Sequence, residues 1–185
     1  MSLAQKENIT GPDRDGLRDI PPTHWARSTA NDLVRVGIIQ GDLQGRFNGD
    51  APLKRADFAI VMSRLSARAS RGPSPIAIPE WAQEQKGCFT RYEFAVVLSR
   101  YSHFLNPGAP PFTDLEAPNG RNEFRDIPQT HWARLAANHV AGFGIIEGDL
   151  QGRFNGNALV TRYEFICALL RHSIFRSHDL CSMKS

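Results

Sequence analysis

The chain has 185 residues, of which 41% are hydrophobic and 22% charged, an ordinary composition for one or two folded domains with a core. Its formal net charge is only +3, and its arginines are spread among acidic residues without a basic run, which argues against a nucleic-acid partner. No apolar run reaches the ~18 residues of a membrane-spanning helix, and the first twenty residues lack the apolar centre of a signal peptide.

An internal repeat dominates the organisation of the chain. Residues 18–64 align without a gap on residues 125–171, with roughly 27 of 47 positions identical. Between them, IPEWA at 78–82 and TRYEFAVVLSRY at 90–101 echo the beginning and the end of the same unit. This middle copy lacks most of the residues between the first and the last motif of the repeat. FTDL at 112–115 is interpreted as the vestigial beginning of a further repeat. The pattern indicates duplication of a helical-pair repeat.

The repeats and their Pro/Gly-rich breaks predict five segments. These are a flexible N-terminal segment 1–17, a first full repeat 18–66, a truncated middle repeat with its linkers 67–111, a second full repeat 112–172 and a C-terminal tail 173–185.

Each full copy is predicted to begin with an amphipathic helix. Apolar residues recur at helical spacing and form one stripe per copy: Trp25, Thr29, Leu33 and Val36, then Trp132, Ala136, Val140 and Phe143. We expect Thr23 and Thr130 to cap the N-termini of these helices. Gly37 and Gly144 follow these helices at the position where a glycine commonly ends a helix.

The segment that follows this helix is GDLQGRFNG in both copies, at 41–49 and 148–156. Its spacing does not fit a calcium loop, because Asp42 is followed by Gln44 and Arg46 where oxygen ligands should stand. Its glycines predict turns around a buried aromatic residue, Phe47 or Phe154. We therefore expect the segment to be scaffold that closes each repeat.

A second helix is predicted to start at TRYE, at 90–93 and 161–164, because Thr and Glu at this spacing form a capping box. The first copy has KRAD at 54–57 and lacks the hydroxyl cap, so its helix start is expected to fray more easily unless tertiary contacts hold it. One face of each helix should be apolar: Phe94, Leu98 and Tyr101, and Phe165, Leu169 and His172.

The order D-I-P-x-T-H-W-A, G-I-I-x-G, G-x-F and T-R-Y-E-F resembles the S-layer homology (SLH) domain, most closely its cyanobacterial branch. The resemblance covers about residues 18–172. It implies an all-α fold in which one helix per repeat forms a pseudo-threefold central bundle, with prongs around it. It also implies a location at the cell envelope, periplasm or cell surface, and grooves that bind peptidoglycan-linked wall polysaccharide, often carrying pyruvate ketals.

In that family the Arg and the acidic residue of the T-R-x-E motif lie at the grooves. Carried over by the resemblance, the candidate ligand-binding residues are Arg55 with Asp57, Arg91 with Glu93, and Arg162 with Glu164. A guanidinium beside a helix N-terminus suits the carboxylate of a ketal. The alternative is a capping box whose Arg is merely solvated. Arg91 belongs to the copy without the GDLQGRFNG segment, which favours the interpretation of that segment as scaffold.

The tryptophans allow two interpretations. Trp25, Trp81 and Trp132 could offer flat faces to sugar rings, and we include Trp25 and Trp132 among the candidate ligand-binding residues. Because they open the apolar stripes, packing in the core is the alternative.

Enzymatic chemistry is not indicated. His24 and His131 lie next to tryptophans without a nucleophile or an acid pair at useful spacing, so they are interpreted as helix-start residues. The three cysteines and six histidines show no metal-ligand spacing, and no cofactor is implied. We therefore interpret the chain as a non-catalytic anchoring module that binds an anionic, in the family often pyruvylated, wall polysaccharide. The alternative is a scaffold that binds a protein partner in an envelope complex, and the chain could be the anchor of a larger protein.

Overall fold

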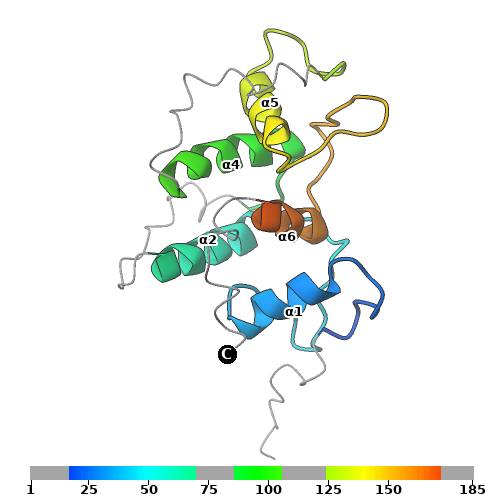
Figure 1. The fold of residues 1–185 in the computed structure, drawn as a ribbon, viewed down its shortest axis with the longest axis vertical. Coiled ribbons are helices and arrows are strands. Elements are labelled where there is room, and N and C mark those ends of the chain that lie inside the picture. The colour runs from blue at the N-terminus through cyan, green and yellow to red at the C-terminus, as the bar shows by residue number, and fades with distance from the viewer. Residues whose placement is uncertain (1–16, 70–85, 106–123, 172–185) are drawn as a thin grey trace, which may run out of the picture. The chain divides into compact units, whose positions relative to one another are not determined.

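The computed structural model describes residues 17–69, 86–105 and 124–171. Within these ranges the chain forms five helices and no strand beyond isolated bridges, so the all-α prediction is confirmed for this part (Figure 1). The helices are α1 (Arg27–Arg35), α2 (Arg55–Ala69), α4 (Arg91–Leu105), α5 (Arg134–Gly142) and α6 (Arg162–Arg171). Several expectations fall outside the described ranges, namely Trp81, the opening at 112–115, and the segments 1–16 and 173–185.

The chain divides into two compact units, Met1–Gly49 and Asp50–Ser185. The first contains α1 and the loop that follows it, and the second contains α2, α4, α5 and α6. The division falls inside the predicted first repeat, after its GDLQGRFNG segment. Each unit is therefore described by itself.

The first helix of each full repeat starts later than predicted. α1 begins at Arg27, and the backbone N–H of Ala26 donates to Nδ1 of His24 at 3.2 Å. In the second repeat the N–H of Ala133 donates to His131 in the same way, at 3.2 Å. The expected threonine caps are wrong, because neither helix has a side-chain cap hydrogen bond. A turn closed by the preceding proline carbonyl places the imidazole, not the threonine hydroxyl, at the N–H just before each helix. The interpretation of both histidines as helix-start residues is confirmed.

The predicted glycine stops are confirmed. Gly37 and Gly144 adopt φ angles of +74° and +66°, a left-handed conformation that favours glycine. The N–H of Ile38 donates to the carbonyl of Leu33, and that of Gly37 to Val34, both at 2.9 Å. This pair of bonds is the Schellman motif that ends a helix.

The predicted apolar stripes are correct only in part. Leu33 and Val140 are buried, but Trp25 is 59% exposed, Trp132 64% and Phe143 52%. The packed face is lined largely by small residues, namely Ala136 of the predicted stripe and, outside it, Ala26, Ala30 and Ala133, each with 0% exposure. Because alanines occupy the packed face, the rest of each unit can approach the helix closely. The tryptophans lie outside this packed face and are exposed. The interpretation of Trp25 and Trp132 as core residues is therefore wrong.

The core of the second unit lies where α2, α4 and α6 begin. The residues just before these helices form a closed cycle of backbone hydrogen bonds, in which Leu53 donates to Val160 at 2.7 Å, Val160 to Phe89 at 2.9 Å and Phe89 to Leu53 at 3.1 Å. Behind this cycle the buried rings of Phe58, Phe94 and Phe165 pack together, with centroid distances of 5.6 to 6.1 Å. The three helix starts thus share one apolar centre.

Both predicted capping boxes are confirmed. The N–H of Thr90 donates to the Glu93 carboxylate at 2.9 Å, and the N–H of Glu93 donates to the Thr90 hydroxyl at 3.3 Å. The corresponding distances for Thr161 and Glu164 are 2.8 and 3.1 Å. These bonds satisfy N–H groups that the helix itself leaves unpaired.

The start of α2 has no such box and is held by its neighbours in the second unit. Lys54 forms an isolated bridge with Cys88, and the N–H of Arg55 donates to the carbonyl of Gly87 at 3.0 Å. These tertiary contacts replace the missing hydroxyl cap.

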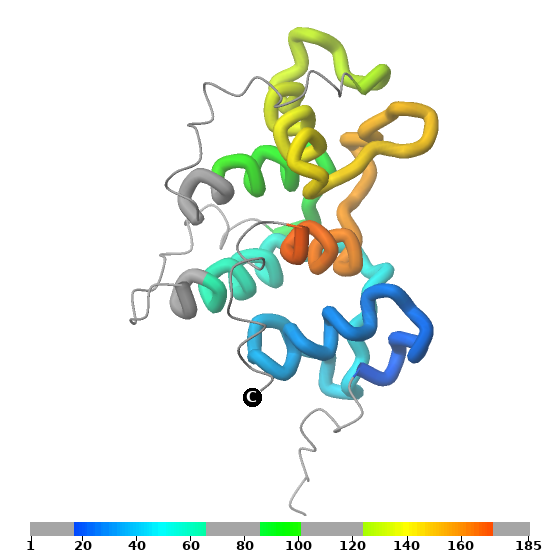
Figure 2. The backbone as a smooth tube through the Cα atoms, in the orientation of Figure 1, coloured from blue at the N-terminus to red at the C-terminus, as the bar shows by residue number. Residues whose placement is uncertain are grey.

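The repeated loop is a hydrogen-bonded turn around a buried aromatic side chain, as predicted. Phe47 and Phe154 are 2% and 0% exposed. In the first copy one oxygen of Asp42 accepts the N–H groups of Gln44 and Arg46, each at 2.9 Å. The Arg46 N–H, together with the Asn48 side chain, lowers the pKa of Asp42 to about 2. The tube in Figure 2 shows the first part of the second copy of the loop projecting from the helices of its unit, whereas its end at Phe154 and Gly156 packs against the start of α4.

An aspartate of the R-D-I-P motif anchors each loop. Asp19 accepts the N–H groups of Phe47 and Asn48, both at 2.6 Å. Asp126 accepts those of Phe154 and Asn155, both at 2.7 Å. The motif that opens a repeat therefore determines the conformation of the loop that closes it.

Candidate binding site

The three motif arginines lie at the starts of α2, α4 and α6, and each pairs with an acidic residue on a neighbouring helix. The pairs are Arg55 with Glu93, Arg91 with Glu164, and Arg162 with Asp57. The arginine side chains are only 12%, 12% and 19% exposed. The alternative interpretation, a capping box whose arginine is merely solvated, is wrong, because each guanidinium forms an ion pair with a second helix.

Arg91 also contacts the loop of the second full repeat. Beyond its pair with Glu164, it donates to the carbonyls of Phe154 at 2.8 Å and Glu147 at 2.7 Å, and its guanidinium lies 5.0 Å from the centre of the Phe154 ring. Although the copy that carries Arg91 has no GDLQGRFNG loop of its own, Arg91 packs against the loop of the second full repeat. The loop therefore lies beside a motif arginine after all.

The acidic partners are also held by the helix ends. Burial alone raises the pKa of Glu93, but the hydrogen bonds from the Thr90 N–H and from Arg55 outweigh it, so that the net pKa lies below the ordinary glutamate value. Glu93 thus serves the cap of α4 and the ion pair with α2 at once.

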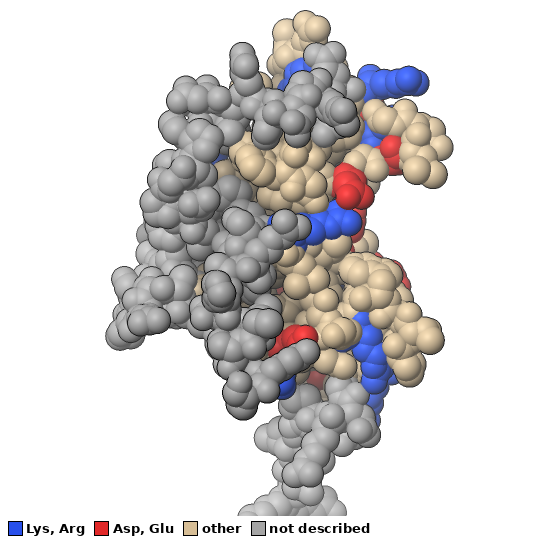
Figure 3. All heavy atoms as spheres, in the orientation of Figure 1, with Lys and Arg blue, Asp and Glu red and all other residues tan. Residues whose placement is uncertain are grey.

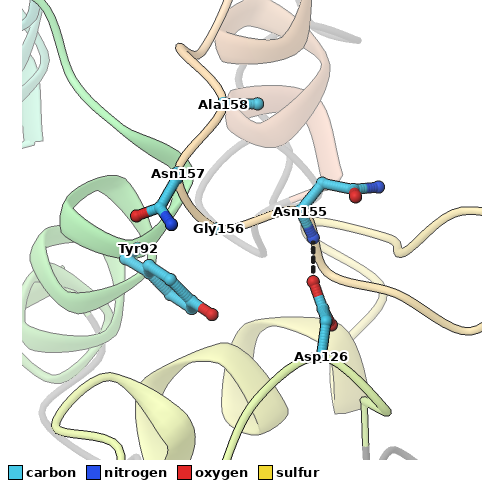
Figure 4. Close-up of a pocket in the computed structure, with 6 residues that line it drawn as sticks. All are labelled: Tyr92, Asp126, Asn155, Gly156, Asn157 and Ala158. Atoms are coloured by element: carbon cyan, nitrogen blue, oxygen red, sulfur yellow. Dashed lines mark hydrogen bonds between the residues drawn. The ribbon is translucent and has the colours of Figure 1, made fainter.

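A pocket of about 330 Å³ lies between the start of α4 and the second full repeat (Figure 4). Its volume is at the lower end of the ~300 to 1,000 Å³ of small-molecule sites. It is lined by Tyr92, Asp126, Asn155, Gly156, Asn157 and Ala158.

Tyr92 forms the aromatic wall of the pocket. Its N–H donates to the carbonyl of Gly156 at 2.9 Å, and its ring lies so close to this glycine that a Cβ there would be 2.1 Å from the nearest ring atom. The rings of His131 and Trp132 lie 4.2 and 6.1 Å away, centre to centre. The exposed Trp132 ring therefore lies beside the Tyr92 ring without lining the pocket.

The remaining lining groups are polar. Burial and the nearby Asp126 carboxylate raise the pKa of Tyr92 above its ordinary value, which keeps its hydroxyl protonated at neutral pH. Figure 4 shows the Tyr92 hydroxyl and the Asn157 side chain at the pocket, with Asp126 bonded to the Asn155 N–H. The arrangement offers hydrogen-bonding groups beside the largely buried Tyr92 ring, which is 6% exposed, and such groups suit sugar hydroxyls.

None of the eight sequence-based candidates lines this pocket. Arg91 and Trp132 flank it through their contacts with Phe154 and Tyr92, respectively. Trp25 lies in the first unit, exposed and next to His24. The remaining candidates lie in the interhelical ion pairs: Arg55, Asp57, Glu93, Arg162 and Glu164.

Sequence reasoning missed the residues that line the pocket. A signal was present, because Tyr92 belongs to TRYE, Asp126 to R-D-I-P, and Asn155 and Gly156 end the segment that is identical in both copies. None of the lining residues had been named as a candidate ligand-binding residue.

Other kinds of site receive no support in the described part of the chain. Its residues contain no group of three or more His, Cys, Asp or Glu side chains placed to hold a metal ion. Among the helices it describes, none is long and apolar enough to cross a membrane. On the face shown in Figure 3, the described basic and acidic side chains are interspersed.

The family model described as "S-layer homology domain" matches residues 16–59 and 123–166. These ranges coincide with the beginning of each full repeat through the start of α2 and α6. Two S-layer homology repeats are therefore confirmed in this chain. The cyanobacterial subtype is not distinguished by this match.

Three curated relatives are similar to parts of the chain. "Outer membrane protein SlpA" of Deinococcus radiodurans is 34% identical over 67 residues, covering 36% of this chain and 6% of the relative. "Outer membrane protein SlpA" of Thermus thermophilus is 40% identical over 52 residues, covering 28% and 6%. "S-layer protein" of Bacillus thuringiensis subsp. finitimus is 23% identical over 164 residues, covering 79% and 20%. The chain thus spans a fifth or less of each of these relatives.

Proposed function

From its two S-layer homology repeats, we propose that the chain is a non-catalytic anchoring module of the cell envelope that binds a wall polysaccharide. S-layer homology domains typically anchor S-layer and outer-membrane proteins to cell-wall polymers. The names of the three relatives support an envelope location. The observation that carries the proposal is the pocket at Tyr92 and residues 155–158, which combines hydrogen-bonding groups with an aromatic wall within a matched repeat region.

The cyclic contacts among α2, α4 and α6 support a finer proposal on architecture. A residue just before each of the three helices donates one backbone hydrogen bond and accepts another, and these bonds form a closed cycle. The motif arginines form a second closed ring, in which each pairs with an acidic residue of another of the three helices. We propose that these helices form the pseudo-threefold central bundle implied by the resemblance. In this arrangement the motif arginines hold the bundle together.

We also propose that the wall polymer is anionic, with pyruvate ketals as the candidate acidic group. The net charge of +3 favours the approach of an acidic polymer at long range. The motif arginines are largely occupied by their ion pairs, so they support this proposal less directly than the sequence suggested.

Co-sedimentation with purified cell-wall sacculi tests the main proposal. The chain should pellet with intact sacculi and remain in the supernatant after chemical removal of the wall polysaccharide. Sedimentation that is unchanged by this removal, or that never occurs with intact sacculi, would contradict the proposal.

A protein partner is the second candidate function, and one observation favours it. Leu43 and Leu150 occupy the same position in the two identical loops, and both are fully exposed, so their retention is not explained by packing. A variant with Leu43→Ser and Leu150→Ser separates the two functions. It should bind sacculi like the natural chain if polysaccharide is the ligand, and it should lose binding if a wall-associated protein docks on these loops.

A further inference from the structure

The repeated loop contains an Asn–Gly pair in each copy, Asn48–Gly49 and Asn155–Gly156. Asparagine deamidates faster before glycine than before other residues, because glycine has no Cβ to shield its backbone nitrogen. Both asparagines are exposed to solvent. Each copy of the loop therefore carries a chemically labile pair at its surface.

Deamidation of such a pair needs only water. The backbone nitrogen of Gly49 forms a bond with Cγ of Asn48, the bond from Cγ to Nδ2 breaks, and the proton of the attacking nitrogen leaves with the amide as ammonia. Water then opens one of the two bonds between the ring nitrogen and a carbonyl carbon of the resulting succinimide, which gives aspartate or isoaspartate. The attack requires the Asn48 side chain to turn back over the following peptide group.

Hydrogen bonds hold each asparagine at its side chain and at its backbone. Nδ2 of Asn48 donates to Oδ2 of Asp42 at 2.9 Å, and the Asn48 N–H donates to Asp19 at 2.6 Å. Nδ2 of Asn155 donates to Asp149 in the same way, also at 2.9 Å. The bond to the carboxylate is charge-assisted, and it opposes the rotation that the attack requires.

The accepting carboxylates stay ionised at neutral pH. The backbone N–H of Arg46 and the Asn48 side chain lower the pKa of Asp42 to about 2, and the Asn155 side chain lowers the pKa of Asp149. Both asparagines have a φ angle of +56°, a left-handed conformation that asparagine adopts more readily than most residues. The turn thus favours asparagine at this position despite its lability.

We propose that Asn48 and Asn155 are deamidation sites that the folded loop keeps unreactive, with Asp42 and Asp149 as the positioning residues. When a loop opens, its asparagine becomes reactive. An aspartate at position 48 would place a second carboxylate against that of Asp42, and an isoaspartate would add one carbon to the main chain before Gly49. Deamidation therefore makes a transient opening of the loop permanent.

The experiment compares the natural full chain with Asp42→Asn during incubation at mildly alkaline pH, and urea-unfolded natural chain gives the rate of an unprotected site. Asp42→Asn keeps an oxygen that can accept the N–H groups of Gln44 and Arg46, but it replaces the acceptor of the Asn48 side chain with an NH₂ group. Mass spectrometry of tryptic peptides measures deamidation and isoaspartate at residues 48 and 155 separately.

Arg46→Ala is the matched control. It removes the ion pair with the same Asp42 oxygen, at 3.0 Å, and leaves that oxygen to accept the Asn48 side chain. Thermal unfolding checks that each variant is folded. Asn155, in the other copy of the loop, is the internal reference.

Asp42→Asn is expected to speed deamidation of Asn48 about tenfold or more, the factor that loss of one charge-assisted hydrogen bond supplies. The rate at Asn155 in this variant, and the rate at Asn48 in Arg46→Ala, should stay within about twofold of the natural rates. An unchanged rate at Asn48 in Asp42→Asn overturns the inference. So does equal acceleration by Arg46→Ala, or a folded natural chain that deamidates at Asn48 as fast as the unfolded one.

Discussion

Gly156→Ala is expected to destabilise the second unit by about 2–3 kcal/mol and to weaken wall binding at least about tenfold. A Cβ at this position would lie 2.1 to 2.3 Å from three atoms of the Tyr92 ring. Tyr92 is 6% exposed and is bonded through its N–H to the Gly156 carbonyl, so the ring cannot move aside without disturbing the pocket. Urea unfolding and sacculus co-sedimentation measure the two effects.

A double variant separates this close contact from a general loss of stability. Tyr92→Ala alone removes the aromatic wall, but Gly156→Ala added to it should cost much less than it does in the natural chain, because the clashing ring is absent. Costs that simply add would show that the glycine is needed for a reason other than its contact with Tyr92.

Arg91→Ala is expected to lower the unfolding free energy by about 2–4 kcal/mol, since it breaks an ion pair whose arginine is mostly buried and leaves two carbonyls without their donor. Arg91 is 12% exposed, and its partners come from α6 and from the loop of the second full repeat. Wall binding should fall with it, because the same contacts support the wall of the pocket. The free energy of unfolding is measured by urea denaturation.

Arg153→Ala is the matched control. Arg153 pairs with Asp149 at 2.8 Å, but its side chain is 52% exposed, so its loss should cost less than about 1 kcal/mol. If both variants were equally stable, Arg91 would not have the structural role proposed here. If Arg91→Ala kept full stability yet lost wall binding, it would be a direct ligand contact, as the family resemblance implies.

Local signals predicted the second helix of each repeat well. The capping boxes at Thr90 and Thr161 depend on residues three positions apart, and the spacing of Phe94 and Leu98 identifies the buried face without any knowledge of partners. The glycine stops and the buried Phe47 and Phe154 follow from equally local constraints. Such features are accessible from sequence because their physical causes lie within one turn or one loop.

Long-range contacts account for most of what was missed. The partners of Arg55, Arg91 and Arg162 lie 38, 73 and 105 positions away, so the sequence could not show that these arginines are paired. The spacing of Trp25 and Trp132 left packing in the core open beside ligand binding, yet alanines one position later occupy the packed face. The pocket requires Tyr92 from one repeat and Gly156 from another, which neither segment indicates alone.

We propose that wall polysaccharide binds in the pocket between α4 and the loop of the second full repeat. The most direct test is to record amide NMR spectra of the full chain while solubilised wall polymer is added. The backbone signals of Tyr92, Asn155 and Gly156 and the side-chain amide of Asn157 should shift most, while those of Gly45 and Phe47 in the first copy of the loop should shift little. Shifts centred on Leu43 and Leu150, or no shifts at the pocket at saturating polymer, would contradict the claim.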